Sequence, residues 1–304
     1  MGKIVVIGSS NVDMIMKMER LPQLGETVTD AEYTQVFGGK GANQAVGAAR
    51  AGGDVTFITS VGNDPLAKTM VQNFKNDGID TSHIFTEEDV PSGAALVMIG
   101  GQGDNYLSVA PGANYRLDRS KIDQVPSALE QAEIIVMQYE IPADTIEYVM
   151  EKAGVLDKPV MWNCAPARDF NRKYLSKIDY LIVNETEAAF LADIKADELA
   201  NIEETADKLL KMGSKTVVIT LGSKGSYVAI QNGDKFSVAA YPVQAVDTTA
   251  AGDVYCGAFA VALVEKKPIR EAVKFASAAA ALAVTKLGAQ PSAPYRQDIE
   301  NMMK

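Results

Sequence analysis

Short runs of β-branched and other apolar residues alternate along this chain with segments of helical periodicity. The first run, at 3–8, ends at a glycine, and an Ala-rich segment at 41–53 ends in two more. Nearly continuous apolar runs are typical of parallel strands that are buried on both faces, and Ala-rich segments that stop at glycine are typical of closely packed helices. Further strands are predicted at 54–62, 132–140, 158–165, 178–185 and 215–222, and a further helix at 203–213. We therefore predict an α/β fold, with a mainly parallel sheet flanked by helices on both faces.

Two stretches, at about 13–39 and 92–114, interrupt this alternation. Both alternate polar and apolar residues and contain glycine turns, and the segment "GGQGDN" at 100–105 suits a hairpin turn. We predict that they form a small β-sheet outside the main one, which covers a cleft as a lid. We expect the whole chain, 1–304, to be a single domain.

The net charge of the chain limits the classes of partner that it can bind. Its 304 residues carry a formal net charge of -10, with a pI of about 4.8. Nucleic acids and anionic membranes require a basic surface, so we expect neither as a partner. The two cysteines, Cys164 and Cys256, lack the spacing of a zinc site. No basic-then-apolar leader begins the chain, and the longest apolar run, near 275–284, is too short to span a bilayer. The expectation is a cytoplasmic protein.

Polar residues follow most of the predicted strands. Ligands of open α/β sheets bind beyond the carboxyl ends of the strands, so these positions are the first candidates for a site. The candidates are Asn11, Asp13, Glu140, Asn163, Asn184, Glu187, the turn at 220–225 and the segment 247–253.

The stretch "AVDTTAAGDVYCGAFA" at 245–260 places small residues and an acid at the start of a predicted helix. Ala250, Ala251 and Gly252 would expose backbone N–H groups that have no partner within the helix. Small side chains let an anion approach these groups, and the helix dipole favours negative charge there. Asp253 is then either a first-turn acid that suits the dipole or a general base beside an anion hole.

The sequences of several motifs resemble those of the ribokinase-like family of carbohydrate kinases. The similarity extends over nearly the whole chain, from "GSSNVDM" to "GAQPSAP". The motifs are "GGKGANQAVGAARAG" at 38–52, "NETE" at 184–187, "TLGSKG" at 220–225, "DTTAAGD" at 247–253 and "GAQPS" at 288–292. The resemblance implies ATP-dependent phosphorylation of D-ribose at O5, with Asp253 as the general base and Ala250–Gly252 as the anion hole. Phosphorylation of 2-deoxyribose, fructose or a nucleoside remains an alternative, and a non-catalytic sugar or nucleotide sensor is a further one.

The resemblance also implies which residues bind the sugar. Hydroxyl groups of the sugar suit carboxylate acceptors and side-chain amides. The implied contacts are Asn11, Asp13, Gly38, Gly39, Lys40, Gly41, Asn43, Glu140 and Asp253. Without the family, Asn11 and Asp13 are equally consistent with a turn after the first strand, and Glu140 with a solvated charge.

Contacts to ATP are implied for a second group of residues. The chain has no GxxxxGK[ST] motif, which excludes the P-loop class, and it lacks the GxGxxG motif of a dinucleotide-binding dehydrogenase after its first strand. The implied ATP contacts are Asn184, Thr220, Leu221, Gly222, Ser223, Lys224, Gly225, Gly252 and Ser277. Glu187 is implied to hold Mg²⁺ indirectly, although Asn184 also suits a plain helix cap. Ser277 stands where the family can carry an adenine-contacting His.

A potassium site and a dimer complete the implied features. The positions that match the family's potassium site are Asp247, Thr249, Ala283, Lys286, Gly288 and Ser292. Backbone carbonyls would supply most of the ligands. The strands of the lid would have exposed edges, and pairing of two lids in a homodimer would cover them.

Overall fold

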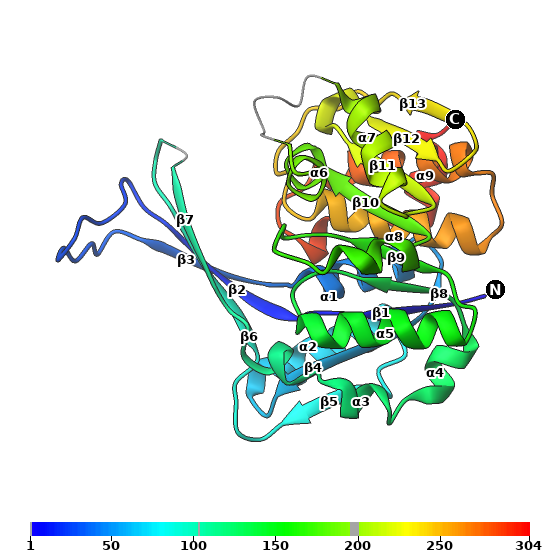
Figure 1. The fold of residues 1–304 in the computed structure, drawn as a ribbon. Helices are drawn as coiled ribbons and strands as arrows, with labels where there is room; N and C mark the ends of the chain where they lie inside the picture. The colour runs from blue at the N-terminus through cyan, green and yellow to red at the C-terminus, as the bar shows by residue number, and fades with distance from the viewer. Residues whose placement is uncertain (1, 103, 195–200) are drawn as a thin grey trace.

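The computed structural model describes residues 2–102, 104–194 and 201–304, and it contains two β-sheets (Figure 1). The larger sheet has nine strands, in the spatial order β13-β12-β11-β10-β9-β8-β1-β4-β5. Its strands are β1 (Lys3–Ile7), β4 (Asp54–Gly62), β5 (Ile84–Glu87), β8 (Ala132–Met137), β9 (Val160–Asn163), β10 (Tyr180–Asn184), β11 (Thr216–Thr220), β12 (Ser226–Ile230) and β13 (Lys235–Val238).

The large sheet is parallel from β11 to β5, and only β12 and β13 pair antiparallel, at one edge. β1 lies between β4 and β8, so the chain builds the sheet outward from β1 in one direction and later in the other. This reversal is a topological switch point, and open α/β sheets bind their ligands in the crevice beyond the carboxyl ends of the strands at such a point, here β1 and β8. The predicted mainly parallel α/β architecture is confirmed.

Helices cover both faces of the large sheet, because each strand buries alternate side chains on opposite faces. Ile4 and Val6 face one apolar cluster with α1, α2, α8, α9 and α10, whereas Val5 and Ile7 face a second cluster with α3 to α7. The α-helices are α1 (Lys40–Arg50), α2 (Pro65–Asn76), α3 (Arg119–Ile122), α4 (Pro126–Gln131), α5 (Ala143–Val155), α6 (Glu185–Ala192), α7 (Ile202–Lys211), α8 (Ala251–Val264), α9 (Ile269–Ala283) and α10 (Arg296–Met302). The 3₁₀ turns are η1 (Gly112–Arg116), η2 (Arg172–Lys177), η4 (Gly222–Lys224) and η5 (Gln290–Ser292). Within the described residues, no helix has the length and apolarity needed to cross a bilayer.

Some elements differ from the sequence prediction. The short strand β5 and the hairpin β12–β13 were not predicted, since each has only four or five residues and lies at an edge of the sheet. The helix expected at 41–53 begins at Lys40 and ends at Arg50, ahead of the two glycines. Gly52 has a φ of 97°, which explains why the helix stops there.

The smaller sheet has four strands in the order β3-β2-β6-β7 and projects away from the large sheet (Figure 1). Its strands are β2 (Asn11–Lys17), β3 (Glu32–Gly38), β6 (Gly93–Ile99) and β7 (Asn105–Ala110). β2 and β6 pair in parallel, and β3 and β7 are the two edges. The prediction of a separate small sheet from the two interrupting stretches is confirmed. The hairpin turn predicted at 100–105 includes Gly103, which lies outside the described residues.

Close packing of α1 on α8 joins the N-terminal and C-terminal parts of the chain. A Cβ atom on Gly257 of α8 would lie 2.5 Å from the carbonyl oxygen of Gln44 and 2.6 Å from the backbone nitrogen of Ala48. A Cβ atom on Gly47 of α1 would lie 3.2 Å from the Cα of Val254. Since backbone atoms fill the space beside both glycines, the two helices contact each other at a distance that only glycine allows.

We predict that Gly257→Ala lowers the free energy of unfolding by about 2–3 kcal/mol, because the added methyl group overpacks the contact of α8 with α1. Gly154→Ala is the matched control. Gly154 lies in α5, where a Cβ atom would meet only the end of Lys177, at 3.5 Å. There the same change removes the helix penalty of glycine and raises stability by about 0.5–1 kcal/mol. Urea denaturation of both variants measures the difference, and equal effects would contradict the packing argument.

Candidate active site

A buried carboxylate lies at the centre of the crevice. Asp253 is in the first turn of α8, and only 5% of its surface is exposed. Its Oδ2 accepts a hydrogen bond from Asn43 Nδ2, and its Oδ1 accepts one from Gln44 Nε2, both at 3.0 Å. Burial raises the pKa of Asp253, whereas Lys40 and the two amide donors act to lower it.

The start of α8 presents bare backbone beside this carboxylate. Ala250 precedes the helix in a left-handed conformation, with a φ of 59°, and the helix begins at Ala251 rather than near Gly252. The N–H of Ala251 is bonded weakly, at 3.3 Å, to the carbonyl of Thr248. In the described part of the chain, the N–H groups of Gly252 and Asp253 have no acceptor. No atom lies within 4 Å of the position of a Cβ on Gly252, so an anion can reach these groups.

Two further acids surround the crevice. Asp13 lies on β2, and burial together with the charges of Glu140 and Asp253 raises its pKa to about 6. Oε2 of Glu140, which follows β8, accepts hydrogen bonds from Ser9 Oγ at 2.5 Å and from the backbone N–H of Lys40 at 3.0 Å. Glu140 is therefore held in place by two hydrogen bonds, although its side chain is only partly buried.

Lys40 is the cation among these acids. The charges of Asp253 and Glu140 raise its pKa, against the opposing effect of its burial. Strongly perturbed titratable groups that share a crevice mark a candidate functional site.

The loop that precedes α1 lies against the strand that carries Asp13. The side chain of Asp13 lies directly over Gly38, so closely that a Cβ atom at that position would overlap its carboxylate. Asn43 follows one helical turn into α1 and reaches Asp253, as described. Among the implied sugar contacts, the structure thus brings together Asp13, Lys40, Asn43, Glu140 and Asp253.

Asn11 has a partner that the sequence reasoning missed. The N–H of Ser10 donates to Asn114 Oδ1 at 2.8 Å, and Asn114 Nδ2 donates to Asn11 Oδ1 at 2.7 Å. Because a backbone N–H can only donate, this pair fixes the orientation of both amides. Asn11 therefore directs its Nδ2 donor, and not its oxygen, away from Asn114. Asn114 lies in η1, four residues after the end of β7 in the small sheet, so the rule that directed the search to the ends of the parallel strands did not reach it.

Most of the residues implied to bind ATP lie at the ends of β10 and β11, whereas Gly252 lies in α8 and Ser277 in α9. Thr220 ends β11, and the turn η4 follows it, with Gly222 and Gly225 at φ values of 56° and 98°. The N–H of Leu221 donates to the carbonyl of Gly225 at 2.7 Å, which closes the turn. Ser223 and Lys224 are exposed on it. A glycine turn of this kind leaves backbone N–H groups open to phosphate oxygens.

Asn184 and Glu187 form a capping box at the start of α6. Asn184 Oδ1 accepts from the N–H of Glu187, and Glu187 Oε2 accepts from the N–H of Asn184, both at 2.9 Å. The helix-cap role that the sequence left open for Asn184 is therefore present. Burial raises the pKa of Glu187. Its other oxygen, Oε1, accepts no hydrogen bond from the described residues and remains open to a water ligand of a metal ion.

Ser277 lies inside α9 and is nearly buried. It lies near the hydroxyl of Tyr255, which is 3.4 Å from Ser226 Oγ. Ser226 directly follows the turn at 220–225, so Ser277 and this turn share Tyr255 as a neighbour. The contact with ATP that the family resemblance implies for Ser277 stays a prediction.

Two loops implied to bind potassium lie side by side. Asp247 Oδ1 accepts from the N–H and the hydroxyl of Thr249 at 2.9 and 2.6 Å, and its Oδ2 accepts from the N–H of Gly288 at 2.9 Å. The N–H groups of Val246 and Asp247 donate to the carbonyl of Val284. Ala283 ends α9, and Lys286 and Ser292 lie in the same loop region and in η5. Within the described residues, no group of three His, Cys, Asp or Glu side chains could hold a metal ion, so a cation here would depend on carbonyl oxygens.

Comparison with known proteins identifies the family. The pfkB family carbohydrate kinase model matches residues 1–296. A ribokinase of Haemophilus influenzae is 39% identical over 97% of this chain and 96% of its own length. The chain belongs to the pfkB family of carbohydrate kinases.

A solved structure and a second relative add detail. The structure of Arabidopsis thaliana ribokinase complexed with ribose and ATP has a TM-score of 0.94 at 33% identity, and the match covers 100% of this chain and 98% of that one. The described fold is therefore ribokinase-like. A deoxyribokinase of Salmonella typhi is also similar, at 34% identity over 96% of this chain and 95% of its own length.

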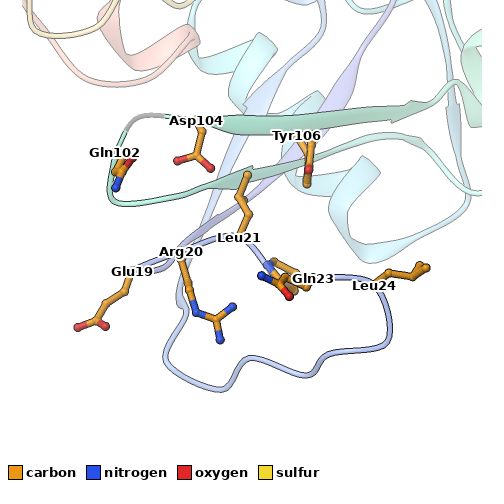
Figure 2. Close-up of a pocket in the computed structure, with 9 residues that line it drawn as sticks. Glu19, Arg20, Leu21, Gln23, Leu24, Gln102, Asp104 and Tyr106 are labelled. Carbon is orange, nitrogen blue, oxygen red and sulfur yellow. The ribbon is translucent and has the colours of Figure 1, made fainter.

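A cavity of about 530 Å³ lies apart from these residues, at the outer end of the small sheet (Figure 2). Arg20, Leu21 and Leu24 from the loop after β2 surround it, together with Asp104 and Tyr106 at the start of β7. None of the implied site residues lines it. Its walls are loop and strand side chains of the small sheet, and it does not extend to Asp253.

Proposed function

We propose that this kinase transfers the γ-phosphoryl group of ATP to the O5 hydroxyl of D-ribose. The observation that carries the proposal is the buried carboxylate of Asp253 beside the unpaired N–H groups of α8, with Asp13 and Glu140 on the same crevice. A carboxylate, a set of N–H donors and further acceptors for hydroxyl groups are the parts that phosphoryl transfer to a sugar requires. Relatives named ribokinase at 39% identity over nearly the full length support the choice of sugar.

Asp253 acts as the general base. It accepts the proton of the O5 hydroxyl while that oxygen forms its bond to the γ-phosphorus and the bond from phosphorus to the ADP oxygen breaks. Burial raises its pKa and so its affinity for the proton, whereas Lys40, Asn43 and Gln44 act in the opposite direction and favour the ionised form. These opposing effects suit a group that must gain a proton during the reaction.

The start of α8 holds the transferring group. The N–H groups of Gly252 and Asp253 can donate to its oxygens, and the helix dipole supports the charge that develops there. The sequence assigned this role to Ala250, Ala251 and Gly252. The weak bond from Ala251 to Thr248 makes its N–H a lesser donor than that of Gly252.

ATP binds along the turn at 220–225, and Asn184 and Ser277 are further contacts for it in this proposal. Mg²⁺, when bound, would neutralise charge on the phosphate oxygens, and Glu187 would hold it through water by way of its Oε1. K⁺, when bound, stabilises the loops of Asp247 and Gly288 through backbone carbonyls. The three hydrogen bonds that Asp247 already accepts hold these loops in a compatible arrangement.

We further propose that the small sheet acts as a lid on the crevice and that the chain works as one domain. β2 carries Asp13 and β3 ends at Gly38, so the sheet is continuous with the sugar site. A lid that excludes water limits the transfer of phosphate from ATP to water.

The same sheet is proposed to pair two copies of the chain. Tyr33, Leu96, Tyr106, Leu107 and Val109 lie on its strands with 42–64% of their surface exposed. We predict a homodimer in light scattering, with loss of dimer in a variant that carries Leu107→Lys and Val109→Lys, since buried charges oppose association. Val155→Lys, which replaces an exposed apolar residue of α5, is the control and should leave the mass of the dimer unchanged. A monomeric wild type would contradict the proposal.

The 2-deoxy sugar is the second candidate substrate, because the similar Salmonella typhi protein is named deoxyribokinase. The two sugars differ only in the 2-hydroxyl group, which one hydrogen-bonding side chain can distinguish.

The test is ADP release from Mg-ATP with ribose, 2-deoxyribose, fructose and adenosine, each with and without K⁺. We expect turnover with ribose to exceed turnover with the other acceptors and to increase in K⁺ relative to Na⁺. Preference for another sugar would retain the Asp253 mechanism and overturn the assignment of ribose. No turnover with any of them would favour the sensor, for which sugar binding is the next measurement.

Asp253→Asn is predicted to lower kcat by roughly 10²- to 10⁴-fold, because the amide cannot accept the proton of O5. Binding of ribose, measured by calorimetry, should change little, since the amide keeps one oxygen acceptor. Wild-type turnover in this variant would rule out the base.

A further inference from the structure

A continuous chain of side-chain amides lies behind the carboxylate of Asp253. Asn163 Nδ2 donates to the carbonyl of Ile182 at 3.1 Å, and Gln44 Nε2 donates to Asn163 Oδ1 at 3.0 Å. The same Gln44 nitrogen donates to Asp253 Oδ1 at 3.0 Å, while Gln44 Oε1 accepts from Gln138 Nε2 at 2.8 Å. This chain of amides joins β10, the end of β9, α1, α8 and the residue that follows β8. All of its side chains are nearly or fully buried.

Two unambiguous acceptors fix the direction of this chain. The carbonyl of Ile182 can only accept, so Asn163 must turn its Nδ2 toward it and its Oδ1 toward Gln44. The ionised carboxylate of Asp253 can also only accept. Asn163 Oδ1 and the Asp253 carboxylate are both acceptors that face Gln44, and each of them independently requires Gln44 to direct its Nε2 toward it. The orientation of the Gln44 amide is therefore determined from two sides.

At the far end of this chain of amides, one buried polar atom of Gln138 is left without a hydrogen-bond partner in the described part of the protein. With Gln44 Oε1 facing it, Gln138 must present its own nitrogen, and its Oε1 is left buried with no partner among the described residues. An unpaired buried acceptor destabilises the folded protein. The arrangement that suits Asp253 is thus retained although a polar atom elsewhere remains unsatisfied.

We propose that Gln44 is a positioning residue that fixes the orientation of the Asp253 carboxylate and keeps it in the charged form that accepts a proton from the substrate. This inference rests on the proposed role of Asp253 as the base. Of the implied sugar and ATP contacts in the described part of the chain, the Gln44 side chain hydrogen-bonds only to Asp253, so its effect on the reaction passes through the carboxylate.

Other charged groups also act on Asp253 and set the background for Gln44. Lys40 at the start of α1 favours the carboxylate. Glu140 after β8, Asp13 on β2 and Glu187 on α6 oppose it. Cys256, on the same helix, is fully buried, and burial raises the pKa of its thiol, so it adds no charge in the neutral range.

The test is the pH profile of kcat/KM in Gln44→Met, which keeps the length of the side chain and removes its donor. A donor to the carboxylate lowers the pKa of Asp253, so its removal raises that pKa. Because the base works only when ionised, activity is lost as pH falls through the pKa, and the acid limb moves to higher pH. We expect a shift of about one to two pH units, which corresponds to one charge-assisted hydrogen bond. Ribose binding at pH 8 should stay within about threefold of the wild type.

Two comparison variants separate positioning from folding. Thr145 lies in α5, away from the crevice, and its hydroxyl donates a buried hydrogen bond to the carbonyl of Leu117. Thr145→Val removes this bond and should lower stability without moving the acid limb. Gln138→Met frees Gln44 Oε1 but leaves both groups that orient its nitrogen. It should move the limb in the same direction as Gln44→Met, by about half a unit or less.

A direct titration completes the design. In protein labelled with ¹³C at aspartate carboxyl carbons, the resonance absent from Asp253→Asn reports the pKa of Asp253 without any turnover. An upward shift of this pKa in Gln44→Met, or in Gln138→Met if the first variant does not fold, supports the inference. An unshifted carboxylate overturns it, even when Asp253→Asn is inactive and the base assignment stands. Full activity of Asp253→Asn removes the proposed function instead, and the titration then shows separately whether Gln44 controls the carboxylate.

Discussion

The contact of α1 with α8 is the constraint on which the site depends. The two helices come from opposite ends of the chain, and glycines at 47 and 257 let their backbones approach. That approach places Asn43 and Gln44 within hydrogen-bonding distance of Asp253. A wider spacing would leave a buried carboxylate without donors, which is a costly arrangement. The close packing of small residues and the hydrogen bonding of the proposed base therefore depend on each other, which explains why both motifs that begin these helices are rich in glycine and alanine.

Much of the fold could be predicted because its signals are local. Continuous apolar runs that end in glycine identified the central strands, and the Ala-rich run identified α1, although the helix ends at Arg50 and not at 53 as predicted. The hairpin β12–β13 escaped because an edge strand of four or five residues shows no distinctive period. The central position of β1 between β4 and β8 also depends on pairing between distant segments, which no single stretch of sequence records.

The candidate site was predicted in a similarly uneven way. Residues directly after strands, such as Glu140, and the first turn of α8 were identified by position alone. Gln44, Gln138 and Asn114 were missed, although two of them lie one or two residues from predicted contacts. Their roles come from hydrogen bonds between side chains far apart in sequence, since Gln44 and Asp253 are 209 residues apart. At Asn184, the local rule and the family pointed to different roles, and a capping box is compatible with both.

The charges of the crevice suit a neutral ligand rich in hydroxyl groups. Asp13, Glu140 and Asp253 act on one another as like charges, and the pKa of Asp13 rises to about 6 as a result of its burial and these neighbours. An anionic ligand would add to this repulsion. A polyol instead brings several O–H donors, each of which stabilises a carboxylate in place of water. The phosphate groups of ATP instead require donors, and the structure offers backbone N–H groups for them at the start of α8 and in the turn at 220–225, so a chain of net charge -10 can bind phosphate without a cluster of cations.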